Sequence, residues 1–181
     1  MLGKQRNASR RKVGRCMGLP KTCTQHWSTI IKNLQDEDAQ GLIGVSSLFI
    51  SKNVGKQSAM NSACSEYARQ ATSFLKGRLL IDWFEYDYDK VEELDRFYDA
   101  YESIIAKEIK SALDPSFTII RSKGMRDGKE TFEMQTFFIV NEKEASKVRL
   151  AAMQKAIEEC ESCQQFAERI AEFVQMGFDI E

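Results

Sequence analysis

Apolar side chains recur along this chain at two spacings, and each spacing predicts a different element. The segment 41–50 is rich in branched and aromatic residues and is short, which favours a strand. After it, Ser51 or Asn53 can cap a helix that runs to about Leu75, with small apolar residues at every third or fourth position on its inner face. Alanines dominate that face, so the helix can lie close to a sheet.

The following segments continue the alternation of helix and strand. Gly77 suits a left-handed helix cap, and 78–84 has the composition of a second strand. Asp87 or Asp89 can cap a third element, a helix whose apolar stripe begins at Val91 and ends before Pro115.

The C-terminal third predicts a hairpin and a helix. The segments 117–123 and 131–140 read as strands on either side of Asp127-Gly128, a pair that favours a tight hairpin turn because both residues accept positive φ. From about 142 to 176 the pattern predicts one long or broken helix.

These elements predict an α+β fold, with helices packed on a mainly antiparallel sheet of about four strands in the order β-α-β-α-β-β-α. We expect residues 1–28 to form a basic flexible leader and residues 29–181 to form a single α+β domain. The length of 181 residues and the 43% hydrophobic content suit one well-buried core. The apolar runs are far shorter than the roughly 20 residues of a membrane-crossing helix, so no transmembrane segment is expected.

The net charge of −1 conceals a basic leader, because eight basic residues precede the first acid, Asp36. Such a leader can bind nucleic acid or an acidic membrane surface by releasing counterions, or it can be a solvated tail. The candidate contact residues are Arg6, Arg10, Arg11, Lys12 and Arg15. The leader lacks the apolar stretch of about 7–15 residues that a secretory signal needs.

The five cysteines leave one unpaired in any full disulfide scheme, which argues against a disulfide scaffold. Cys160 and Cys163 form a CxxC, a spacing used in metal binding and thiol exchange. Their predicted position inside a helix, on its apolar stripe, favours buried core cysteines instead. A zinc site built from Cys16, Cys23, His26 and the CxxC is the alternative, although the spacing of the first pair is not standard.

Other catalytic signals are weak. The acids of 85–95 could imitate a calcium loop or a general-acid pair, but they lack its glycine and terminal glutamate, and a helix start attracts acids through its dipole. No nucleotide-binding, zinc-protease or nucleophile-elbow motif occurs. We therefore expect no enzyme activity, no cofactor and no metal site.

The aromatic and acidic segment 83–88 is the most prominent candidate for a binding surface. Trp83, Tyr86 and Tyr88 are residue types that anchor protein interfaces, with acids between them that keep the segment soluble. The alternative is that Trp83 belongs to the core and the tyrosines lie against it.

The order of these features, from about Trp27 to Glu159, resembles the Lpp-twenty lipoprotein-like family of bacterial cell-envelope and flagellar outer-membrane disk proteins. The similar pieces are the opening Trp27, the glycine-containing strand 42–46, the helix with Ala59, Ala63, Ala68-Arg69 and Ala71, and the hairpin with Asp127-Gly128 followed by 137–145. Members of that family usually carry an export signal, and many carry a lipid-modified cysteine. Here Arg15 stands where the cleavage site before Cys16 would have a small residue.

The resemblance implies a non-enzymatic structural or assembly protein of the bacterial envelope, acting as a homo-oligomer or with an envelope partner. The expected location is then the periplasm or outer membrane, or the cytoplasm if the chain start is genuine. The alternative function is a cytoplasmic binding module whose basic leader contacts nucleic acid or acidic lipid.

Overall fold

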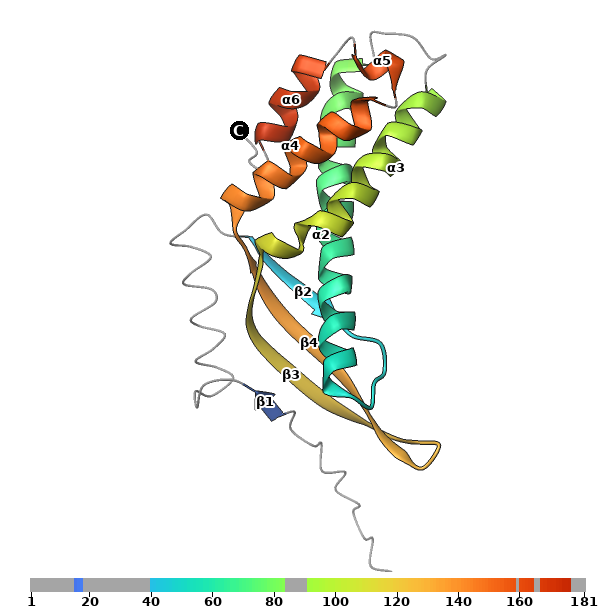
Figure 1. Ribbon diagram of the computed structural model, residues 1–181, viewed down its shortest axis with the longest axis vertical. Coiled ribbons are helices and arrows are strands. Elements are labelled where there is room, and N and C mark those ends of the chain that lie inside the picture. Colours follow the sequence, from blue (N-terminus) through green and yellow to red (C-terminus); the bar gives the residue numbers. More distant parts are fainter. Residues whose placement is uncertain (1–14, 18–39, 84–90, 159, 165–166, 177–181) are drawn as a thin grey trace, which may run out of the picture.

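The computed structural model describes residues 15–17, 40–83, 91–158, 160–164 and 167–176. Figure 1 shows a sheet at one end of the molecule and a bundle of helices at the other, with the long helix α2 running through both. The elements are β1 (Arg15–Met17), β2 (Gly41–Val45), α2 (Lys52–Trp83), α3 (Val91–Glu108), a 3-10 turn η2 (Ile109–Ala112), β3 (Leu113–Arg126), β4 (Lys129–Val140), α4 (Glu142–Glu158), α5 (Glu161–Gln164) and α6 (Ala167–Met176). The predicted α+β class is confirmed.

The sheet is antiparallel, with the strand order β1-β3-β4-β2. Its centre is the β3–β4 hairpin, which turns at Asp127 and Gly128 with φ of 51° and 74°. The hairpin predicted from this Asp-Gly pair is therefore confirmed. β2 pairs with β4 from Gly41 opposite Ile139 to Val45 opposite Gln135, and β1 adds a short edge beside β3.

One predicted strand is wrong, and with it the predicted element order. The segment that was expected to be a strand from residue 78 continues α2 as far as Trp83. Leu75 and Leu79 are both 3% exposed and lie one helical turn apart, so burial in the bundle favours helix over the strand composition of the segment. Gly77, expected to end the helix, lies inside it.

The N-terminal half of α2 packs on one face of the sheet. A Cβ on Gly44 would lie 2.0 Å from the carbonyl oxygen of Ala59, so β2 and α2 approach as closely as glycine and alanine allow. Ala59 and Ala63 are completely buried there. This confirms the alanine-faced helix and the close backbone approach.

Helix α2 also covers the free edge of β2. The backbone N–H of Val45 donates to Ser62 Oγ (3.3 Å), and that of Ser47 donates to Ser58 Oγ (3.0 Å). The backbone groups of Gln40 and Ser46 form hydrogen bonds with β4. Backbone groups alternate in direction along a strand, so the N–H groups of Val45 and Ser47 point away from β4. The serine hydroxyls therefore occupy edge donors that would otherwise be open to another strand.

In the bundle, α2 packs against α3 and α6, and α4 packs against α3 and α6 (Figure 1). The final segment, predicted as one long or broken helix, is broken into α4, α5 and α6. Among the described residues, no helix combines the length and apolar character needed to cross a membrane.

Candidate functional site

The structure places few of the residues expected to bind partners. Trp83 is the last residue of α2, whereas Tyr86 and Tyr88 lie outside the described residues. In the leader, Arg15 begins β1 and pairs with Ile120. Arg6, Arg10, Arg11 and Lys12 lie outside the described residues. Binding through the aromatic segment or through the leader therefore stays a prediction.

The two cysteines of the CxxC form a disulfide with a Cα–Cα distance of 5.2 Å. Both are buried, as expected of core cysteines, with exposures of 2% and 0%. The expected position within a helix is wrong for Cys160, which lies between α4 and α5, whereas Cys163 lies in α5. The Cys163 N–H donates to Cys160 Sγ at 3.2 Å. Across the described ranges, no group of three or more His, Cys, Asp or Glu residues is placed to hold a metal, while Cys23 and His26 lie outside those ranges.

A buried arginine, Arg149, bonds to residues of three helices of the bundle. Arg149 of α4 is 2% exposed and forms an ion pair with Glu142, the first residue of the same helix. The same guanidinium donates to the hydroxyl of Tyr67 on α2, and its Nε lies 3.4 Å from the carbonyl oxygen of Val174 on α6. Arg149 thus links α4 to α2 and α6, while the side chain of its partner Glu142 stays 45% exposed.

The surroundings of this cluster raise the pKa values of both Tyr67 and Arg149. Burial raises the pKa of Tyr67 to about 12, although the charge of Arg149 acts against that rise. Burial opposes the charge of Arg149, but its hydrogen bond to Glu142 and its attraction to Tyr67 and Glu142 outweigh it, so the pKa of Arg149 is raised. Around neutral pH Arg149 is therefore charged and the phenol of Tyr67 is neutral.

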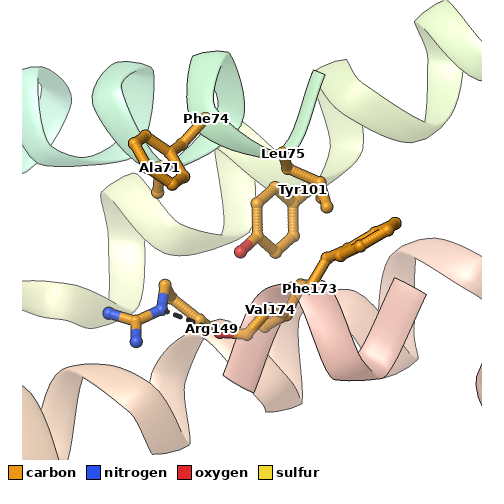
Figure 2. A pocket seen from close by; sticks show the side chains of 7 residues that line it. All are labelled: Ala71, Phe74, Leu75, Tyr101, Arg149, Phe173 and Val174. Carbon is orange, nitrogen blue, oxygen red and sulfur yellow. Dashed lines mark hydrogen bonds between the residues drawn. The ribbon is translucent and has the colours of Figure 1, made fainter. Parts of the chain in front are cut away.

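The cavity beside Arg149 is too small for a substrate. Figure 2 shows it between α2, α3, α4 and α6, with the Tyr101 hydroxyl directed to the side where Arg149 lies. Its volume is about 10 Å³, which is roughly the space of a single water. Burial also raises the pKa of Tyr101. The cluster is suited to holding the bundle together and leaves no room for a reacting molecule.

Sequence reasoning did not single out Arg149, although a signal was present. It follows Ala145 by four residues and precedes Ala152 by three, so it occupies the apolar stripe of the last helix. A charged residue on such a stripe needs a buried partner.

The opposite end of the molecule exposes apolar side chains. We define the distal end as residues 46–56 and 121–133, which comprise the β2–α2 loop, the first turn of α2 and the outer part of the hairpin. Its exposed apolar residues are Leu48 (49%), Ile50 (58%), Val54 (58%) and Met125 (69%).

Contacts around Phe49 bring these parts together. Phe49 is 3% exposed and exchanges two backbone hydrogen bonds of 2.9 Å with Phe132 of β4. Its ring lies against Gly55 of α2, where a Cβ would approach it to 2.6 Å. Met125 of β3 lies opposite Glu130 of β4, close to the hairpin turn. Glu130 precedes Phe132 by two residues, so Met125 lies near the Phe49 contacts. Loop, helix start and hairpin therefore form one surface (Figure 1).

The distal end is also basic. It carries six basic residues and three acids. The first turn of α2 contains no acid, although the helix dipole favours acids there, and Lys52 and Lys56 stand near it instead. By contrast, α3 in the bundle carries six acids and two basic residues.

A second exposed apolar surface lies on the face of the sheet opposite to Gly44 and α2. We call this surface the outer sheet face. Ile43 and Val45 of β2 are 48% and 40% exposed on it. Ile43 pairs with Phe137, whose ring stacks on that of Phe117 with centroids 4.3 Å apart.

Comparison with known proteins places the chain in no family: no family model, no curated protein and no solved structure matches it. The envelope family suggested by the sequence pattern stays a prediction.

Proposed function

We propose that this protein is a non-enzymatic structural or assembly protein of the bacterial cell envelope, and that it self-associates through the outer sheet face. One observation carries the proposal of self-association. Ile43 and Val45 expose nearly half of their surface on that face, although the other face of the sheet already packs on α2. The envelope location rests on the sequence resemblance alone.

An antiparallel sheet with one covered face normally alternates apolar residues inward with polar residues outward. β2 departs from this rule, because Leu42 faces α2 while Ile43 and Val45 are apolar on the other side. In β4, Phe138 faces α2 beside Leu42, whereas Ile139, opposite Gly41, is apolar on the other side. Phe117 on the same face is only 6% exposed, so the apolar exposure lies on the β2 side, at Ile43 and Val45, and favours a second layer there.

We assign that layer to a second copy of the chain. Two identical sheet faces can pack about 10 Å apart across a two-fold axis, which makes the contact self-complementary. Addition of a strand at the β2 edge is disfavoured, since Ser58 and Ser62 already bond the edge N–H groups of Ser47 and Val45. Face packing leaves those bonds intact.

The buried polar groups support a role without catalysis. The buried Arg149 bonds to both Tyr67 and the half-exposed Glu142, and Cys160 and Cys163 are joined in a disulfide. The cavity next to Arg149 holds about one water. These groups are used to fix helices in place.

The test is the molar mass by light scattering over a wide range of protein concentration. We expect the wild-type mass to rise toward twice the monomer mass, and the double variant Ile43→Thr, Val45→Thr to stay monomeric. Threonine keeps β propensity, so the strand should persist. Ile50→Thr, at an exposed position of the distal end, is the matched control and should associate like wild type.

A wild-type chain that stays monomeric at every concentration contradicts the proposal. So does a double variant that associates as strongly as the wild type. A monomer in which Ile43 and Val45 are protected from surface labelling would mean that another part of this chain forms the second layer.

A further inference from the structure

We infer that the distal end docks on the surface of an anionic lipid bilayer. The inference goes beyond self-association, because it uses different residues from those of the outer sheet face. It rests on three properties of the distal end: where its apolar side chains lie, how firmly they are held, and which charges surround them.

The exposed apolar side chains are concentrated at this half of the molecule. Of the seven large hydrophobic residues that are exposed in the described part of the chain, four belong to the distal end and two to the adjoining strand β2. The seventh is Met176 on α6. Several large apolar side chains exposed at one end of a molecule are typical of a site of interaction with a protein or a membrane.

The apolar side chains of the loop are held by a buried anchor. Leu48 and Ile50 flank Phe49, whose ring is buried and whose backbone pairs with Phe132 in both directions. Val54 follows in the first turn of α2, next to the Gly55 that receives the Phe49 ring. Because the backbone is already fixed, inserting these side chains into an apolar phase costs little further ordering.

The surrounding charges favour an anionic surface. Lys52 and Lys56 lie near the start of α2, and Arg126 and Lys129 flank the hairpin turn. Lys123 is paired with Glu133 at 3.1 Å, which leaves the other basic side chains in excess over Asp127 and Glu130. Each basic side chain near an anionic membrane strengthens binding about fivefold at modest ionic strength. Long lysine and arginine side chains can also reach the headgroups while the apolar residues insert.

The shape and composition of the distal end favour lipid over a protein partner. It lies at the far end of the sheet, where the β2–α2 loop and the start of α2 lie beside the hairpin and the hairpin turn extends beyond them (Figure 1). Its four exposed apolar residues are aliphatic or methionine, whereas the anchors of protein interfaces are most often tryptophan, tyrosine or arginine in a packed centre. A projecting apolar group ringed by basic residues suits insertion of about 5–10 Å into the lipid interface.

The experiment is flotation of the full chain with vesicles of phosphatidylglycerol and phosphatidylcholine, compared with vesicles of phosphatidylcholine alone. Wild type should bind the anionic vesicles at least tenfold more tightly, and salt should weaken that binding. The double variant Ile50→Ser, Val54→Ser should lose tenfold or more. Lys52→Gln with Lys56→Gln should lose at least severalfold, while Met176→Ser, an exposed apolar residue at the other end, should bind like wild type.

The outcomes separate this inference from self-association. If the monomeric variant Ile43→Thr, Val45→Thr still binds anionic vesicles, the distal end acts without the second copy. Equal binding to neutral and anionic vesicles overturns the inference. Unchanged binding by a correctly folded Ile50→Ser, Val54→Ser protein, checked by circular dichroism, overturns it as well, as does failure of wild type to bind vesicles at all.

Discussion

The helix bundle and the distal end of this protein treat their charged groups in opposite ways. In the bundle, Arg149 is buried and satisfied by Glu142, Tyr67 and Val174, which belong to the same chain. At the distal end, Lys52 and Lys56 stand at a helix start that the dipole makes unfavourable for them. The buried charge of Arg149 stabilises the fold. Lys52 and Lys56 are unfavourable for the start of a helix, and such a departure from local preference points to a role in function.

The same helix serves both regions. The first half of α2 meets the sheet through Gly44 and Ala59, and the second half is buried in the bundle through Leu75 and Leu79. If the two regions differ in this way, substitutions in the bundle and at the contact between β2 and α2 should lower the stability of the fold. Substitutions at the distal end should instead weaken binding to anionic lipid.

The largest expected effect comes from Arg149→Ala. The change removes the hydrogen bond to the buried Tyr67 hydroxyl, the ion pair with the half-exposed Glu142 and the link to α6, so we expect the free energy of unfolding to fall by about 3 kcal/mol. Urea unfolding followed by circular dichroism measures it. The matched control is Lys147→Ala on the same helix, whose pair with Glu144 is exposed and whose loss should barely move the midpoint. Similar urea midpoints for Arg149→Ala and Lys147→Ala would contradict a stabilising role of the buried Arg149 contacts.

An intermediate effect is expected from Gly44→Ala at the contact between β2 and α2. The added methyl would lie 2.0 Å from the carbonyl oxygen of Ala59, so the backbone of the helix or the strand has to move. Overpacking of this kind costs about 1–3 kcal/mol. Thermal unfolding of Gly44→Ala beside wild type tests it, and an unchanged midpoint would mean that α2 does not press on β2 as closely as the structure shows.

Much of this architecture could be predicted from local sequence patterns, and the wrong predictions have physical reasons. The Asp127-Gly128 hairpin and the alanine face of α2 were predictable because a turn type and a helical spacing are local properties. The helical course of residues 78–83 was not, because a short apolar run fits a buried strand and a buried helix equally well. Only packing against the rest of the bundle decides between them.

The candidate surfaces were harder to predict than the fold. Leu48 and Ile50 fell within a predicted strand, and their exposure depends on Phe49 turning inward to meet Phe132 from another part of the chain. Arg149 carried a readable signal in its position on an apolar stripe, but its partners on α2 and α6 are set by the three-dimensional packing. The residues expected to bind, Tyr86 and Tyr88, lie outside the described part.

The smallest expected effect has the opposite sign and decides whether α2 truly spans both regions. Gly77 is exposed inside the helix, and a Cβ there would meet nothing within 4 Å. Gly77→Ala should therefore raise the free energy of unfolding by about 0.5–1 kcal/mol, because alanine restricts the unfolded chain and favours helix. If Gly77 were instead a left-handed cap before a strand, the same change would strain the backbone and lower stability. The sign of the shift in the urea midpoint thus separates a continuous helix that joins the two regions from a helix that ends between them.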